Sequence, residues 1–585
     1  MRYMEHMEKL TSYYPKGLDI ETSIQEVSKL LHCTPKHVKT VLHYGDQQQL
    51  LNWHAERGRG KHPRIRMNVS KDDFLFIRAK QSVQQENYHD AFQLMESASV
   101  WVQQQFKDWF LKQFNHIQME SDRELDVFRY PFYNVGLIMD PMYAKSRHDS
   151  HMIQQIFNRL VEYDRESDEL VPSLAHNWES EDGINWYFYL HKGIHFHHGK
   201  RLTSDDVKQS FNRLRKLQLF KHEIEWITTP SITTVHFQLN KINWIFPRYL
   251  AKMSASIIPM DVLKEVGEQQ FQKFPVGSGP YQLTVHNNDK IRLEAFNDYF
   301  GKRSWIDRVD IIQTPKLYQS DLDSPFLLES PDQSWHKLDV IEEGAEFILF
   351  NDNTEICQDI DTRKMIRYCI HRYKFQKHQS RKIPAHSFLS EQSRSNSEVQ
   401  QGGSSCEEPK GNLQSIIHRK IHRPIRIAAQ QIREDAHHRP VAEILQKQLE
   451  DLGIQSIIEM LPVENYYKDI KHYDLFVGGV MLGEDRLLSL VSNLYGSTIS
   501  ISECIHESEM RTELIHQLNR MKQEKEDSKR WNIYFKLEEQ LISKHYIYFL
   551  SHRTHSIYEP SDHHYGSLQL DQNGRVDYRR IWKRW

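Results

Sequence analysis

Histidines are unusually dense in one short stretch of the 585-residue chain, which contains His191, His195, His197 and His198. On a strand only alternate side chains share a face, so His195 and His197 can point the same way. His191 joins them only if the strand continues unbroken past Gly193. A second polar cluster, Asp435-Ala436-His437-His438, stands alone. Imidazole and carboxylate groups can bind zinc, but we favour structural roles at both places and predict neither a metal nor another cofactor.

Fingerprints of the common catalytic sites do not occur in the sequence. The chain contains no GxSxG, HExxH, P-loop or GxGxxG motif. Gly58-Arg59-Gly60 is too short to cradle a phosphate and fits the tip of a β-hairpin better. A hydrolase would need a nucleophile beside a base, and nothing in the sequence indicates such a pair. We therefore predict that the protein is not an enzyme and has no catalytic residues.

Basic residues gather in one segment near the amino terminus. Between Lys29 and Arg66 the chain has eight lysines and arginines against two acidic residues, a net charge of +6. The formal net charge of the whole chain is -3, which excludes a globally basic nucleic-acid coat protein. A local basic patch of this kind suits contacts with phosphates, although a solvated surface on a protein-interaction domain is the alternative.

The elements around that segment predict a winged helix-turn-helix. Ser23 and Glu26 have the spacing of a capping box, and Thr34-Pro35 starts a second helix after a tight break at Cys33. Residues 50–55 and 64–69 then predict two strands of a hairpin, the wing. We expect five side chains of the second helix to face the major groove: Lys36, His37, Lys39, Thr40 and His43. We expect four wing residues on phosphates or in the minor groove: Arg57, Arg59, Lys61 and Arg64.

The run LLHCTPKHVKTVLHYGDQQQLLNWHAERGRGKHPRIRM, residues 30–67, resembles the amino-terminal winged helix of SgrR-type transcriptional regulators. The residues that stand in the family's positions are Thr34, His37, Val38, Thr40, Trp53, Ala55, Gly58, Arg59, Gly60 and Lys61. The resemblance implies that residues 1–70 form a domain that binds double-stranded DNA. Residues 71–118 read as helical throughout and predict a connector. This connector could act as a relay or as the contact of a homodimer, although plain core packing is the favoured interpretation of its apolar residues.

From residue 122 onward, short aromatic and β-branched runs alternate with helical stretches, which predicts a mixed α/β body. Its motifs lie at 169–178, 182–190, 196–207, 275–283 and 348–351. These motifs resemble the family 5 extracytoplasmic solute-binding proteins. The resemblance implies a two-lobed, type II periplasmic-binding-protein-like α/β fold. Lobe one would span about 122–345 plus the carboxy-terminal tail, and lobe two about 346–545.

The same resemblance implies a small-molecule ligand: a peptide, a sugar or a sugar phosphate. Tyr281 and Asn351 stand in family motifs and are candidate ligand contacts. Asp485 could bind a ligand cation, although a surface aspartate is the favoured interpretation. Ser390–Gly411 is polar and nearly free of bulky apolar residues, and it predicts a mobile surface loop.

The sequence also bears on where the protein works. It has no run of about 18 apolar residues, which a membrane helix needs, and its start lacks the pattern of a secretory signal. The five cysteines form no disulfide framework. We therefore predict a cytoplasmic one-component transcriptional regulator with no membrane partner, whose ligand domain covers residues 122–585. The alternative is the solute-binding component of an ABC importer.

Overall fold

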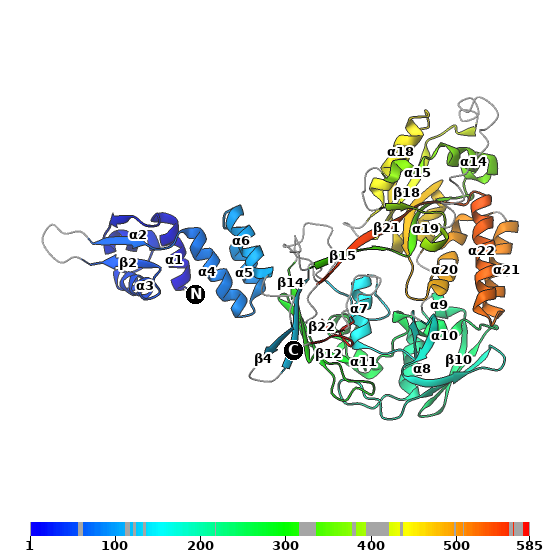
Figure 1. Ribbon diagram of the computed structural model, residues 1–585, viewed down its shortest axis with the longest axis horizontal. Helices are drawn as coiled ribbons and strands as arrows, with labels where there is room; N and C mark the ends of the chain where they lie inside the picture. Colours follow the sequence, from blue (N-terminus) through cyan, green and yellow to red (C-terminus); the bar gives the residue numbers. More distant parts are fainter. Residues whose placement is uncertain are drawn as a thin grey trace. The chain divides into compact units, whose positions relative to one another are not determined.

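The structure is a computed structural model in which the chain forms two compact units (Figure 1). Unit 1 contains Met1–Leu137, Leu283–Ala295 and Trp305–Pro331, and unit 2 contains Ile138–Gln282, Phe296–Ser304 and Asp332–Trp585. The structure describes residues 2–55, 63–111, 117–120, 125–132, 136–144, 146–165, 167–216, 218–314, 335–376, 382–393, 420–432, 437–495, 499–506, 508–560, 565–566 and 577–583.

The amino-terminal part of unit 1 is a winged helix. Its helices are α1 (Arg2–Tyr13), α2 (Ile24–Leu31) and α3 (Pro35–Gln47). Its strands are β1 (Asp19–Glu21), β2 (Leu51–His54) and β3 (Arg64–Met67), and they form an antiparallel sheet in the order β1-β3-β2. The predicted helix pair and hairpin are confirmed. Strand β1 was not predicted, and it adds a third strand beside β3.

Short-range hydrogen bonds fix the start of each helix of the pair. Ser23 accepts a bond from the Glu26 amide, and the Glu26 carboxylate accepts one from the Ser23 amide, so the predicted capping box is confirmed. Thr34 caps α3 by accepting from the His37 amide at 3.3 Å. Between the helices the chain turns through His32, whose φ of 52° is left-handed and ends α2.

The connector consists of three helices: α4 (Lys71–Gln84), α5 (Tyr88–Glu96) and α6 (Val100–Leu111). The expectation of helix throughout 71–118 is therefore wrong in three places. Glu86, with a φ of 61°, lies in the break between α4 and α5, and residues 97–99 separate α5 from α6. Residues 117 and 118 belong to strand β4 (Ile117–Glu120). The apolar residues of the connector pack mostly on each other, around Phe106 and Phe110. Trp101 is an exception and is 68% exposed.

A five-stranded sheet completes unit 1, in the order β12-β13-β14-β5-β4. Its further strands are β5 (Leu125–Phe132), β12 (Tyr281–His286), β13 (Lys290–Ala295) and β14 (Arg308–Gln313). Strand β14 runs parallel to β5 and antiparallel to β13, and all six of its residues are buried. One of them, Ile312, belongs to the apolar core of the connector. The connector and this sheet therefore share one core.

The first half of unit 2 is built on a four-stranded sheet, β10-β11-β9-β8. Its strands are β8 (Ala175–Glu179), β9 (Asn185–Leu190), β10 (Ile224–Ser231) and β11 (Thr234–Leu239), with a separate hairpin of β6 (Val161–Asp164) and β7 (Glu169–Pro172). Its helices include α7 (Arg147–Ile156), α8 (Ser204–Leu214), α10 (Phe246–Leu250), α11 (Met260–Val266) and α12 (Glu268–Lys273). Strand β9 lies within the motif at 182–190, and Thr203 is the N-cap residue of α8.

The second half of unit 2 is a seven-stranded mixed sheet with helices against it. Its strands are β15 (Trp335–Ile341), β16 (Gly344–Phe350), β17 (Lys382–Pro384), β18 (Ile425–Gln431), β19 (Ser456–Pro462), β20 (Leu475–Met481) and β21 (Ile547–Pro560). Its main helices are α14 (Ile360–Cys369), α18 (Arg439–Glu450), α20 (Arg486–Leu494), α21 (Ser508–Gln523) and α22 (Asp527–Ser543). The motif at 348–351 lies at the end of β16, which is buried along its whole length.

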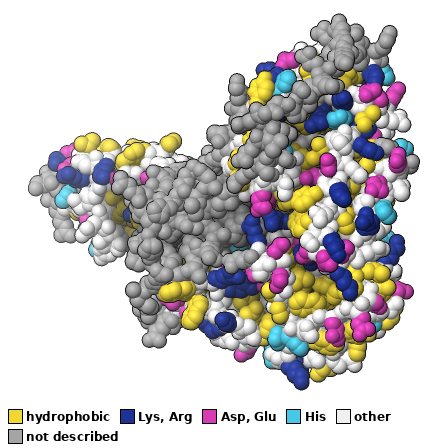
Figure 2. Space-filling view, turned by 45° about the vertical axis from the view of Figure 1, so that its right-hand side comes forward, with side chains coloured by type: hydrophobic (Ala, Val, Ile, Leu, Met, Phe, Trp, Pro, Cys, Tyr) yellow, Lys and Arg dark blue, Asp and Glu magenta, His cyan; other side chains and the backbone are white. Residues whose placement is uncertain are grey.

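Charged side chains of both signs are interspersed over the face seen in Figure 2. Among the described helices, none is long and apolar enough to cross a membrane. The prediction of a mobile loop from Ser390 is wrong for its first residues, because Ser390 and Ser393 are buried and hydrogen-bonded to Glu343 and His552, respectively. The remainder of that prediction, from residue 394 onward, lies outside the described residues.

Candidate functional site

Helix α3 presents a polar face on the surface of the winged helix. Val38, Val41 and Leu42 are buried in the domain core. The side chains of Lys36, Lys39, Thr40 and His43 are exposed. Residues three and four apart lie next to each other on a helix, so these four form one surface. Gln47 extends it, because its amide nitrogen lies 2.9 Å from Nε2 of His43. The sequence analysis had not singled out Gln47.

His37 differs from the other predicted contacts of α3 because it is half-buried. Its ring lies 5.5 Å from that of Tyr3 and 5.2 Å from that of His6, both on α1. Tyr3 in turn lies 5.4 Å from the ring of Tyr44. His37 therefore packs α1 against α3 and supports the exposed face.

Two arginines of the wing strand β3 form ion pairs with acidic residues of β1. Arg64 on β3 donates to Glu21 at 3.2 Å, and Arg66 lies 3.7 Å from Asp19. Both acidic residues come from β1 and lie just outside the segment that carries the net charge of +6. Arg64 therefore has an acidic partner in the free protein. The other predicted wing contacts, Arg57, Arg59 and Lys61, lie outside the described residues.

The connector is fastened to the five-stranded sheet by ion pairs. Glu86, at the break between α4 and α5, pairs with Lys290 and Arg292 of β13. Arg292 also donates to Asp310 of β14 at 2.6 Å, and Asp310 accepts from Arg129 of β5 at 3.1 Å. Burial by itself raises the pKa of Asp310, but these arginines outweigh it and hold the pKa below its usual value. One network thus runs from the connector across three strands.

A cleft of about 330 Å³ opens in unit 2 between its two halves. The first half contributes α7, Tyr163 and the segment Arg248–Met253, and the second half contributes Met481–Asp485 and the start of α20. The polar side chains that line it include Ser146, Ser150, His151, Gln154, Tyr163, Arg248, Lys252, Glu484, Asp485 and Ser489. Its size and its mixture of hydroxyl, amide and charged groups suit a small polar molecule.

Asp485 lies in this cleft but is committed to protein partners. One carboxylate oxygen accepts from Arg248 at 2.9 Å, and the other accepts from the Leu488 amide at 2.9 Å and so caps α20. Arg248 also pairs with Asp527 and lies over the ring of Tyr163 at 5.1 Å. The favoured expectation of a surface aspartate is wrong, because Asp485 is only 8% exposed. Desolvation raises its pKa, although Arg248 opposes that change.

Lys252 is the second cation of the cleft. Its ammonium donates to the hydroxyl of Ser492 on α20 at 3.0 Å. The residue as a whole is half-buried, but its charged end lies deep enough that desolvation lowers its pKa to about 8. Within the described parts of the chain, no carboxylate lies within 4.0 Å of this ammonium. Nothing in the sequence pointed to Lys252, because an isolated lysine in a loop is ordinary.

The other two predicted ligand contacts lie away from the cleft. Tyr281 is fully buried, and its hydroxyl donates to the carbonyl of Tyr578 at 3.2 Å. Asn351 is also fully buried, and its amide donates to the carbonyls of Ile470 and Tyr473 at 2.9 and 2.7 Å. Both side chains stabilise buried turns, so the expectation that they contact a ligand is corrected.

The histidine stretch has a structural explanation at His197. Its Nδ1 accepts from the Gly277 amide at 3.2 Å, and its Nε2 lies 3.0 Å from the Gly279 carbonyl, to which it donates in the neutral ring. Burial lowers the pKa of His197 to about 4 and favours that neutral form. A Cβ on Gly277 would lie 2.0 Å from the carbonyl oxygen of Ile156, so this turn requires glycine.

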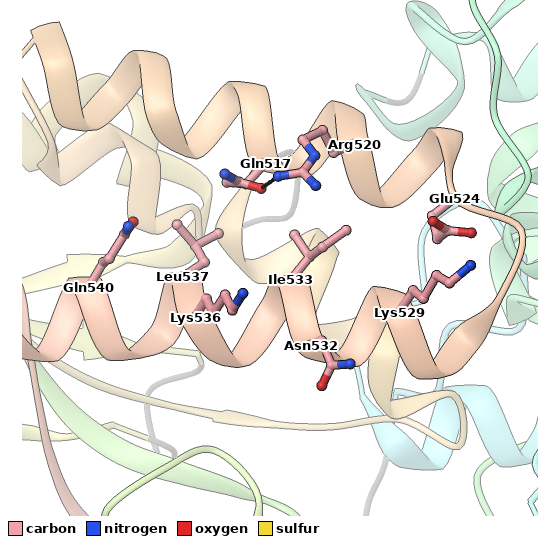
Figure 3. A pocket seen from close by; sticks show the side chains of 9 residues that line it. All are labelled: Gln517, Arg520, Glu524, Lys529, Asn532, Ile533, Lys536, Leu537 and Gln540. Carbon is pink, nitrogen blue, oxygen red and sulfur yellow. Dashed lines mark hydrogen bonds between the residues drawn. The ribbon is translucent and has the colours of Figure 1, made fainter.

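A second hollow lies between α21 and α22 (Figure 3). Its volume is about 270 Å³, and the side chains labelled in Figure 3 come from these two helices and, in the case of Glu524, from the segment that joins them. Gln517 and Arg520 of α21 bond to each other at 3.1 Å, and Lys536 of α22 is exposed to solvent. Because solvent screens its charges, this groove is a weaker candidate for ligand binding than the cleft.

Comparison with known proteins matches two families. Residues 169–501 match "Bacterial extracellular solute-binding proteins, family 5 Middle", and residues 2–116 match "Sugar transport-related sRNA regulator N-term". The first match covers more than half of the chain, and its range contains most of the cleft. The second covers the winged helix and the connector.

Similar curated proteins are named HTH-type transcriptional regulator SgrR. The one from Yersinia enterocolitica is 32% identical over 353 residues, which is 60% of this chain and 61% of that protein. The one from Photorhabdus laumondii is 32% identical over 355 residues, covering 60% and 62% of the two chains. The chain thus matches about three fifths of the length of these relatives.

Similar solved structures cover about 78% of the chain. One is HbpA2 from Haemophilus parasuis, with a TM-score of 0.61 and 16% identity over 78% of this chain and 100% of that one. Another is DppA from Helicobacter pylori in complex with the peptide STSA, with a TM-score of 0.59 and 18% identity over 78% and 98%. At these identities the likeness shows the two-lobed periplasmic-binding-protein fold.

Proposed function

This chain belongs to the bacterial extracellular solute-binding proteins of family 5. Because a winged helix precedes that part of the chain, we propose that the protein is a transcriptional regulator. It binds double-stranded DNA through the winged helix and senses a small polar solute in the cleft of unit 2. The observation that carries this proposal is the combination of an exposed polar face on α3 with the family match of residues 2–116. The names of the curated relatives support the same function.

The DNA interface would consist of α3 and the wing. Lys36, Lys39, Thr40 and His43 would enter the major groove, because they form the exposed surface of a helix in a helix-turn-helix pair. Arg64 and the predicted wing residues Arg57, Arg59 and Lys61 would contact phosphates or the minor groove. His37 would contribute indirectly, by holding α3 against α1.

Ligand sensing requires a physical path from the cleft to the DNA. The solute would favour one arrangement of the two halves of unit 2, and only its differential affinity for the two arrangements can change DNA binding. On the side of unit 1, the ion pairs of Glu86 and the shared core at Ile312 join the connector to the sheet. Movement of the sheet would therefore also move the connector.

The remaining assignments follow from this function. A regulator that binds DNA works in the cytoplasm, and the ligand classes compatible with the cleft are peptides, sugars and sugar phosphates. Self-association through the connector stays a prediction. A role as the binding component of an importer is less well supported, because it leaves the winged helix without a task.

DNA binding by the full-length protein tests the proposal. We expect binding to a duplex from the upstream region of its own gene, with affinity that falls steeply as salt rises. A ligand of the cleft should change that affinity by roughly 5- to 150-fold, the range typical of coupling between two sites. Fluorescence anisotropy of labelled duplex is the assay. Absence of binding at low salt would rule out the DNA-binding function.

A further inference from the structure

We propose that the cleft binds the anionic group of its ligand, a phosphate or a carboxylate, through the ammonium of Lys252. This inference deepens the proposed function, since it names the chemical class of the solute that the cleft senses. It rests on the cleft, on the state of each charge that lines it and on the polar side chains of α7 that line the same cleft.

The other fixed cation of the cleft is already neutralised. Arg248 holds the carboxylates of both Asp485 and Asp527, and all three groups belong to protein contacts that span the two halves of unit 2. Asp485 in turn has both oxygens occupied, by Arg248 and by the Leu488 amide. A ligand amine would have to displace Arg248 to reach Asp485, so this carboxylate is poorly placed to recognise a cation.

Lys252, unlike Arg248, forms no ion pair with a carboxylate among the described residues. Its described hydrogen bond goes to the neutral hydroxyl of Ser492, and an ammonium has three protons to donate. A desolvated cation without a paired carboxylate is costly, which is why burial lowers the pKa of Lys252 to about 8. The charge of Asp485 opposes this change only in part, so an anion in the cleft would add a counter-charge and offset the remaining cost.

Polar side chains of α7 can bind the rest of such a ligand. Ser146, Ser150 and Gln154 are spaced four residues apart on α7 and its cap, so they lie along one face that lines the cleft. Hydroxyl and amide groups of this kind donate to phosphate or carboxylate oxygens and to the hydroxyls of a polar molecule. The cleft therefore joins one cation to a row of neutral polar groups.

Binding of the anion should depend on pH in a defined direction. Only the protonated lysine attracts an anion, so affinity is retained below pH 8 and falls about tenfold per pH unit well above it. Bound anion should raise the pKa of Lys252 and so cause proton uptake near pH 8. The other titratable or charged groups of the cleft are His151, Tyr163, Arg248, Glu484 and Asp485, with Asp527 behind Arg248.

Calorimetry on the full-length protein provides the test, with inorganic phosphate and acetate as separate probes at constant ionic strength. The two probes distinguish a site for phosphate from a site for carboxylate. At pH 7 we expect Lys252→Met to weaken binding of the preferred anion at least tenfold, while Lys252→Arg retains most of it. Lys536→Met, in the exposed groove of Figure 3, is the matched control and should bind like the unchanged protein.

Two results would overturn the proposal: equal affinity of Lys252→Met and the unchanged protein, or no binding of either anion at about 50 mM. DNA affinity of the same variants, measured separately, distinguishes a failure of the anion site from a failure of the regulatory function. A protein that binds DNA but fails the anion test remains a regulator with an uncharged or cationic ligand. A protein that passes the anion test but never binds DNA keeps the site and loses the regulatory function.

Discussion

The ion pair between β1 and the wing leads to a prediction that runs against intuition: removing an acidic residue should strengthen DNA binding. Glu21 accepts from Arg64 at 3.2 Å, and both side chains are about half exposed, at 58% and 50%. If Arg64 contacts a phosphate, it must either leave Glu21 or bring that carboxylate close to the DNA. The variant Glu21→Gln removes this competition and keeps the shape of the side chain.

The size of the effect follows from the exposure of the pair. An exposed ion pair contributes about 0–1 kcal/mol, so removing Glu21 should cost little stability and should gain up to about fivefold in DNA affinity. One additional phosphate contact makes the slope of log affinity against log salt concentration more negative by about 0.9. Between 50 and 200 mM salt, that slope corresponds to an additional loss of about 3.5-fold.

Fluorescence anisotropy with a labelled duplex, repeated across that salt range, measures both quantities. Glu265→Gln removes an exposed acidic residue from α11 of unit 2 and is the control for overall charge. A double-mutant cycle with Arg64→Ala tests the cause, because Glu21→Gln should have no effect once Arg64 is absent. Unchanged or weaker binding by Glu21→Gln, or the same gain in the Arg64→Ala background, would refute the reasoning.

Three further predictions concern α3, the connector and the polar loop. Lys39→Ala should weaken binding to the preferred site more than to random DNA, and equal losses in anisotropy would place Lys39 on phosphate alone. Asp310→Asn should lower the free energy of unfolding by about 3–5 kcal/mol in urea, since it leaves arginines uncompensated around a site that is almost fully buried. Because the pKa of Asp310 is lowered in the folded protein, its contribution to stability is fully present above the pKa of the unfolded state. That contribution is lost as pH falls through the pKa of the folded state. In urea unfolding at a series of falling pH values, the difference in free energy between the variant and the unchanged protein should therefore shrink. Deleting residues 394–411 should leave the melting temperature nearly unchanged, whereas deleting 390–411 should lower it, because Ser390 and Ser393 are packed.

Local structure could be predicted from the sequence with good accuracy. The capping box at Ser23, the helix start at Thr34 and the hairpin strands within 50–55 and 64–69 all appear as expected. The burial of Val38 and Val41 follows from their spacing along α3. Each of these features depends on residues within a few positions of one another, so the sequence contains the whole interaction.

Contacts between distant segments decided the rest. Strand β1 brings Glu21 to Arg64 across 43 residues, the connector reaches the sheet through Glu86 and Lys290 across 204, and Arg248 reaches Asp485 across 237. The sequence alone made Asp485 a surface residue and left Lys252 unnoticed. Whether a charged side chain is free or already paired depends on which groups the fold places beside it. Charge state and desolvation are therefore properties of the tertiary structure, and in this protein they determine which cation in the cleft remains available to a ligand.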